Sequence, residues 1–225
     1  MKLLKLSSSF VLLIPLLLNL GCSSSGDDST DPTTDFALFP ASTFTAGYTE
    51  TRYLSGPDST GERYTGTLST QTQPTSTYFG QPAIPIVIEA QFTNTATGLN
   101  IADISTGYYS TSANDRHYLG FDSPIETTVS AVTSAIPQTA QIGDFGAIGT
   151  YTFNSGNVAE LSWRLDDDGN DLAKRFIHTT FKDQLNNIIF SKTSTSTIDI
   201  SGNFITTQLV YYFSDTDWAI TLDAQ

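Results

Sequence analysis

The sequence predicts an all-β fold, built as one antiparallel up-and-down meander of about ten long strands that is strongly curved or barrel-like. Three observations support this prediction. Apolar and polar residues alternate with a period of two over most of the chain after residue 36, turn-forming residues separate the alternating segments, and a helical period is almost absent. Because a sheet of that size usually curls, closes or splits into two layers, a β-sandwich is the alternative.

The first half of the domain contains the clearest example of alternation. Ile84, Ile86, Ile88 and Phe92 share one face of a strand. Pro85 marks the start of that strand as an edge or entry position, because proline cannot donate to a ladder. Segment 123–141 is the least periodic and is expected to hold one strand and a long loop. The strands expected here are Tyr48–Leu54, Arg63–Gln71, Ile84–Phe92, Ile101–Thr111, Arg116–Phe121 and Thr127–Val132.

The second half alternates as clearly, with Ala159, Leu161, Trp163 and Leu165 on one face of a strand. Gly and Asn recur between its strands because tight hairpins need positive φ. Such short turns make consecutive strands antiparallel neighbours. The strands expected here are Ile148–Phe153, Val158–Leu165, Leu172–Lys182, Ile188–Ile200, Phe204–Phe213 and Trp218–Leu222.

The N-terminal segment 1–22 has the composition of a targeting segment. Lys2 and Lys5 precede an apolar run over 10–20, which is well short of the roughly 20 apolar residues that a membrane-spanning helix needs. Gly21 and Cys22, the only cysteine of the chain, follow the run. This order resembles a bacterial lipoprotein signal peptide, with Asn19 standing where that pattern prefers leucine.

The resemblance implies cleavage after residue 21 and attachment of acyl chains, such as palmitate, to Cys22. Ser23 follows the cysteine, which points to the outer membrane, either its periplasmic or its surface face. Residues 22–35 would then carry the lipid and a disordered tether, because SSSGDDSTDPTTD has no apolar residue to bury. Residues 36–225 would form a single β domain. The alternative is an ordinary secretory peptide that leaves a free thiol at Cys22.

Charge narrows the set of partners. The chain has 225 residues and a formal net charge of −13, and removal of residues 1–21 with Lys2 and Lys5 would leave 204 residues at −15. A surface this acidic argues against nucleic acid and against electrostatic binding to anionic lipid. Membrane attachment is therefore expected through the lipid anchor.

One acidic turn is a candidate metal site. Asp166, Asp168 and Asp171 lie in the segment DDDGND, and Ca²⁺ prefers several carboxylate oxygens around a tight turn that glycine allows. The segment resembles the front half of an EF-hand loop but lacks the downstream glutamate of that pattern. The favoured alternative is an acidic hairpin turn without a cofactor.

Aromatic residues are the candidate ligand-binding groups, because Tyr and Trp combine an apolar ring with a polar tip. The adjacent Tyr211 and Tyr212 must place one ring on each face of the sheet. Trp163 and Trp218 recur on two further strands of the same meander. The alternative is ordinary pairing of aromatics across strands.

A catalytic group does not emerge from the pattern. His117 and His178 are the two histidines, and no serine lies in a Gly-x-Ser-x-Gly elbow. The first expected function is therefore an interaction or structural lipoprotein that displays its domain to an envelope protein partner. The second is a binding module that holds a lipid or saccharide on or inside the curved sheet. A hydrolase is a third, and a membrane-spanning barrel is a fourth that the polar end Asp223-Ala224-Gln225 disfavours.

Overall fold

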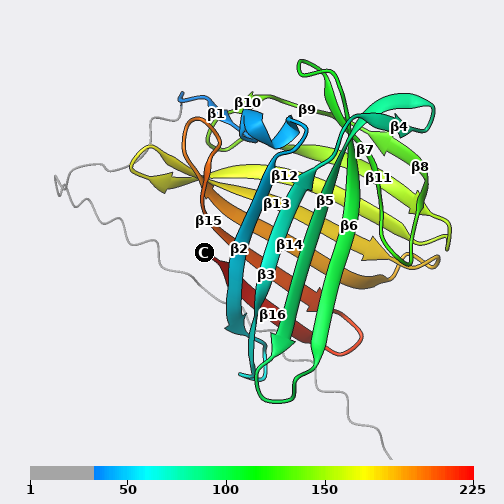
Figure 1. Ribbon diagram of the computed structural model, residues 1–225, viewed down its shortest axis with the longest axis vertical. Coiled ribbons are helices and arrows are strands. Elements are labelled where there is room, and N and C mark those ends of the chain that lie inside the picture. Colours follow the sequence, from blue (N-terminus) through cyan, green and yellow to red (C-terminus); the bar gives the residue numbers. More distant parts are fainter. Residues whose placement is uncertain (1–32) are drawn as a thin grey trace, which may run out of the picture.

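The computed structural model describes residues 33–225, which form a barrel-like all-β domain (Figure 1). This confirms the predicted class, since the described part contains sixteen strands and one short 3₁₀ turn, η1 (Ala41–Phe44). The predicted signal segment, Cys22 and residues 23–32 of the predicted tether lie outside the described residues. Within 33–225, no helix has the length and apolar character to cross a membrane.

Twelve strands of the described part have six residues or more, and four have two or three. The strands are β1 (Phe36–Ala37), β2 (Thr49–Pro57), β3 (Arg63–Thr72), β4 (Ser76–Tyr78), β5 (Gln81–Asn94), β6 (Asn100–Ser110), β7 (Arg116–Asp122), β8 (Thr128–Thr133), β9 (Ala135–Ile136), β10 (Thr139–Ala140), β11 (Phe145–Phe153), β12 (Val158–Gly169), β13 (Leu172–Lys182), β14 (Ile188–Ile198), β15 (Phe204–Phe213) and β16 (Trp218–Ala224).

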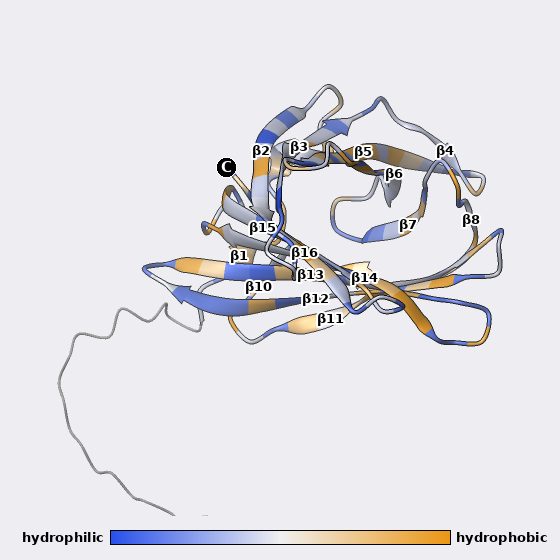
Figure 2. Cartoon of the chain, turned by 90° about the horizontal axis from the view of Figure 1, so that it is seen from below, coloured by the Kyte–Doolittle hydropathy of each residue, from blue (hydrophilic) through white to orange (hydrophobic). Residues whose placement is uncertain are grey.

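The long strands are arranged around the barrel almost in chain order. The order is β8-β11-β12-β13-β14-β15-β16-β2-β3-β5-β6-β7-β9, with β4 beside β5, and β1 and β10 form a separate pair. The pairs are antiparallel, so the predicted meander is confirmed. The first long strand pairs with the last through Ser55–Asp223 and Leu54–Ala224. This pairing curls the meander into a barrel-like form, not the alternative sandwich (Figure 2).

Strands β7 and β8 meet at a seam that is held mainly by side chains. One isolated backbone bridge joins Asp122 to Thr127. Beside it, the Thr128 hydroxyl donates to the Phe121 carbonyl at 2.6 Å and accepts from the Phe121 N–H at 3.1 Å. The Tyr78 hydroxyl donates to the Asp122 carboxylate at 3.2 Å. The barrel is therefore nearly closed at this seam without a regular ladder.

Two glycines permit the tight curvature on the opposite side of the barrel. A Cβ atom at Gly66 would lie 1.9 Å from the carbonyl oxygen of Gln91, and one at Gly56 would lie 1.9 Å from that of Thr221. Any side chain at these positions would push neighbouring strands apart, so only glycine fits.

Inward-facing apolar residues pack one end of the barrel and one side of the other end, and leave its middle hollow. One packed cluster contains Phe36, Leu38, Trp163, Leu165 and Ile198, which cover the end beside the N-terminal segment. A second cluster packs the other end on the side of β2, β3, β5, β15 and β16. It contains Leu54, Tyr64, Phe92, Leu209, Tyr211, Ile220 and Leu222.

The structure departs from the predicted strands mostly where elements are short. The segment between the predicted strands Arg63–Gln71 and Ile84–Phe92 contains β4, and segment 123–141 contains β9 and β10 as well as β8. Pro85 lies inside β5 one residue beyond the last β3–β5 pair, Thr72–Ile86, so its missing N–H breaks no bond of that ladder.

Candidate functional site

The barrel encloses a cavity of about 610 Å³ between its two packed clusters. Its wall consists largely of aliphatic and aromatic side chains that alternate inward along their strands. Figure 2 looks along the barrel, with β3, β5 and β6 on one side of the interior and β12, β13 and β14 on the other. Representative wall residues are Ile86, Ile88, Leu161, Ile177, Phe190 and Leu209.

An ion pair from β2 lies in the wall of this cavity. Arg52 Nη2 lies 2.6 Å from Glu50 Oε1, and the side chains are 14% and 26% exposed. Arg52 also donates from Nη2 to the carbonyl oxygen of Phe204 at 2.9 Å. Its charge is therefore compensated within the protein.

A second ion pair joins two distant strands across the interior. Lys192 Nζ on β14 lies 2.5 Å from Asp103 Oδ2 on β6, and the Tyr211 hydroxyl donates to the same oxygen at 3.1 Å. Burial alone would lower the pKa of Lys192, but the Tyr211 oxygen and the Asp103 carboxylate outweigh it and raise that pKa above its ordinary value. Lys192 is therefore charged at neutral pH, and its charge has a partner within the protein.

Arg175 on β13 is the cavity-lining cation that lacks such compensation. Its side chain is only 5% exposed, and among the described residues no carboxylate lies within ion-pair distance of it. Nη1 donates to the carbonyl oxygen of Leu38 at 2.6 Å, whereas Nε is buried without a partner. Burial lowers the pKa of Arg175 from 12.5 to about 10, which leaves the group charged at neutral pH.

Aromatic rings surround this guanidinium. The Phe204 and Phe39 ring centroids lie 4.5 and 4.6 Å from its central carbon. The Tyr109 ring packs against Phe39 at 6.4 Å. Burial raises the pKa of Tyr109 to about 12 despite the opposing effect of Arg175 and Arg116, so its hydroxyl stays a donor at neutral pH. The guanidinium therefore lies between aromatic faces that attract it weakly by cation–π interaction but bring no counter-charge.

The cavity reaches the surface beside the loop between β7 and β8. Ile125 of that loop and Ile189 at the start of β14 both line the cavity, and they are 86% and 40% exposed. The edge of β6 that β7 leaves unpaired contributes Ala102 and Ile104. We call this opening the mouth.

The four aromatic residues predicted from the sequence lie in three places, because only Tyr211 and Trp218 share a cluster. Trp163 is 7% exposed within the packed end beside the N-terminal segment. Trp218 packs at the other end and donates to Asp58 at 3.0 Å. Tyr211 points inward to Asp103, whereas Tyr212 faces outward and donates to Asp217 at 3.1 Å. The structure therefore does not bring the four together.

The three predicted metal ligands lie around the β12–β13 hairpin. Asp166 pairs with Arg164 at 3.1 Å, and Asp168 pairs with Lys174 at 2.5 Å and accepts from Thr197 at 2.7 Å. Asp171 lies in the turn with φ of 57°. In the part of the chain that the structure describes, no cluster of three or more His, Cys, Asp or Glu side chains is arranged to hold a metal ion.

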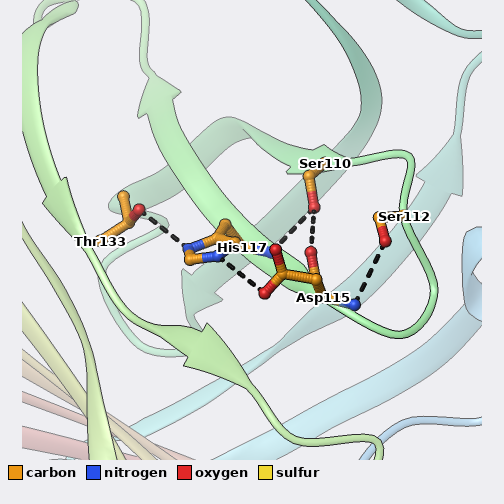
Figure 3. Close-up of polar contacts among 5 residues, drawn as sticks. All are labelled: Ser110, Ser112, Asp115, His117 and Thr133. Carbon is orange, nitrogen blue, oxygen red and sulfur yellow. Dashed lines mark hydrogen bonds and ion pairs between the residues drawn. The ribbon is translucent and has the colours of Figure 1, made fainter.

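His117 on β7 lies between a hydroxyl and a carboxylate (Figure 3). Its Nδ1 lies 3.1 Å from Thr133 Oγ1 on β8, and its Nε2 lies 3.1 Å from Asp115 Oδ1. The Asp115 side chain is 71% exposed, so water competes for it and it holds the ring weakly. The contact to Thr133 spans the β7–β8 seam, which makes a role in closing the barrel the simplest explanation.

The polar groups of the cavity were not singled out from the sequence, although strand phase places Arg175 on the inward face. Leu172, Phe176 and His178 on β13 form one face, and Ala173, Arg175, Ile177 and Phe181 form the other. The second face points into the barrel. The signal that the sequence offered was the strand phase of Arg175, which it shares with the apolar residues Ala173, Ile177 and Phe181.

No known family model matches the chain, and neither the curated proteins nor the solved structures contain a match to it. The class is therefore defined by the fold and the site themselves. Residues 33–225 form a nearly closed, antiparallel β-barrel-like domain with a hollow, mostly apolar interior, and among them Arg175 is a buried, cavity-lining cation without a carboxylate partner.

Proposed function

We propose that this domain binds a small amphipathic, lipid-like molecule inside its barrel. The observation that carries the proposal is the cavity of about 610 Å³, since ligand pockets typically measure about 300–1,000 Å³ and combine apolar walls with a few placed polar groups. Native interiors are otherwise densely packed, so a hollow of this size is a costly feature that ligand binding explains.

The composition of the wall favours a lipid over a saccharide. A saccharide presents many hydroxyl groups, and each would need a hydrogen-bond partner in a buried site. The polar side chains of Arg52 and Glu50 bond each other, and Lys192 and Asp103 do the same. The remaining wall offers mainly aliphatic and aromatic surface, which suits a hydrocarbon chain.

We further propose that the domain is held at the outer membrane by acyl chains on Cys22. The support is the order of charged, apolar and small residues before that cysteine. The intact mass of the N-terminal peptide from cells tests this. A peptide that starts at Cys22 and carries acyl chains supports the anchor, and an unmodified Cys22 contradicts it. Display of the domain to an envelope protein partner remains the alternative function.

Blocking the cavity from one strand tests the proposed binding. Ser194 on β14 lines the cavity, and Ser191 on the same strand has the opposite phase and faces outward. Ser194→Phe is expected to remove saturable binding of the apolar dye Nile red, and Ser191→Phe is expected to keep it. Equal binding by both variants, or no saturable binding by the unmodified chain, would contradict an interior site.

A further inference from the structure

We propose that the occupant is a single-chain amphiphile with a carboxylate head, bound with that head against Arg175 and its chain directed toward the mouth. This inference rests on the proposed function, because it assigns a chemical class and an orientation to the ligand of the same cavity. Charge, hydrogen bonding and the shape of the cavity each support it.

Among the described residues, three cations and three carboxylates line the cavity, and one of these cations has no carboxylate beside it. Arg52 is paired with Glu50, and Lys192 is paired with Asp103, which leaves Arg175. Glu126 also lines the cavity, but at the mouth, where Ser155 and Asn157 donate to it. Asn157 adjoins the Val158–Lys182 pair, so Glu126 lies level with the far end of β13. A buried cation without a counter-charge, in a chain of net charge −13, is a specific attractor for a singly charged anion.

The hydrogen-bonding capacity of Arg175 is equally unfilled. A guanidinium carries five N–H donors in a planar fork. One of them bonds the Leu38 carbonyl, and the buried Nε has no partner among the described residues. Nε exposes almost no surface, and Phe39 and Phe204 lie against the guanidinium, so a ligand in the cavity would bind Arg175 through its Nη groups. A carboxylate matches this fork with two parallel hydrogen bonds.

The path from Arg175 to the mouth suits an extended hydrocarbon chain. Ile177, Thr179 and Phe181 follow Arg175 on the inward face of β13, and all line the cavity. Six residues of strand from Arg175 to Phe181 span about 20 Å. At the end of that path the exposed apolar side chains of Ile125 and Ile189 form the rim. A chain entering at the mouth would therefore meet apolar surface along its length and the cation at its end.

A headgroup series with one chain length separates this inference from the proposed function. The full chain, stripped of bound lipid, is titrated with palmitate, hexadecanol and hexadecylamine by displacement of Nile red. We expect palmitate to bind at least tenfold more tightly than the alcohol, because a buried charge-assisted pair contributes about 1.4 kcal/mol or more. The amine is expected to bind most weakly. Acetate alone is expected not to displace the dye, because it lacks the chain.

Arg175→Met should reduce palmitate affinity to that of hexadecanol and leave the alcohol nearly unchanged, and Arg175→Lys should be intermediate. The matched control is Arg164→Met, which removes an exposed arginine that pairs with Asp166 on β12. Circular dichroism checks that each variant is folded. The headgroup preference is also measured on the unmodified chain, so that result does not depend on the folding of a variant. If the alcohol binds as tightly as palmitate, the inference is wrong while the proposed function stands. If none of the three chains binds, the proposed function is wrong.

Discussion

Replacing Arg175 by methionine should make the ligand-free protein more stable, although it removes the group that we assign to ligand recognition. The guanidinium is buried without a carboxylate partner, and its pKa falls from 12.5 to about 10 because burial disfavours the charged form. A site that costs stability in the absence of ligand is the expected trade-off between function and stability.

The magnitude follows from that pKa. A pKa that is lower by about 2.5 corresponds to roughly 3 kcal/mol of unfavourable charge burial at pH 7. Methionine removes this cost and keeps contact with the Phe39 and Phe204 rings through its thioether. It loses the hydrogen bond to the Leu38 carbonyl, which costs about 1–2 kcal/mol. It also loses the cation–π attraction of the two rings, which costs about 0.5–1 kcal/mol. The expected net gain is about 1 kcal/mol.

Thermal unfolding of delipidated protein measures this gain. For a domain of this size, about 1 kcal/mol corresponds to a rise in Tm of roughly 2–4 °C. Because the folded-state pKa of Arg175 lies below its unfolded value, the cost is fully present below pH 10 and decreases as the pH rises toward 12.5. The gain should therefore be constant between pH 6 and 9. A Tm of Arg175→Met below that of the unmodified chain would refute the claim that this cation lacks a compensating partner.

Three further predictions concern the frame around the cavity. Asp103→Asn should lower the free energy of unfolding by about 2–3 kcal/mol, because it leaves Lys192 without its counter-charge, and adding Lys192→Met should restore at least half of the loss in urea denaturation. Hydrogen bonds outweigh the effect of burial and lower the pKa of Asp58 from 3.8 to about 2. Asp58→Asn should therefore destabilise the protein by about 2 kcal/mol at pH 7. In guanidinium titrations this difference in stability should disappear as the pH falls through 4 toward 2, and a pH-independent difference would contradict the prediction. Gly66→Ala should greatly reduce the soluble yield, because its Cβ would meet the Gln91 carbonyl oxygen at 1.9 Å, and normal solubility and stability would show that the strands can move apart.

The sequence alone was sufficient to predict the long strands, because their local residue pattern defines them. β13 and β15 begin and end at the predicted residues, since Gly and Asn turns border strands of clear alternation. The strands of two or three residues could not be predicted. β9 and β10 exist only because β7 and β1 lie beside them in the fold, and two residues carry no periodicity.

The cavity could not be predicted, because its wall residues have the same identity as core residues. Ile177 lines a hollow and Leu165 lies in a packed cluster, yet both are aliphatic residues at inward positions of their strands. Aromatic content pointed instead to Trp163 and Trp218, which pack in the two clusters at the ends of the barrel. The informative residue was Arg175, because a charge in phase with apolar neighbours indicates either a buried partner or a ligand.

The most direct test of the account is a crystal structure of the full chain after incubation with palmitate. The account predicts electron density for one extended chain inside the barrel, with its carboxylate about 3 Å from the guanidinium of Arg175 and its other end near Ile189 at the mouth. Density with the carboxylate at the mouth would contradict the assigned orientation. An empty interior at saturating palmitate would contradict the proposed function of the barrel.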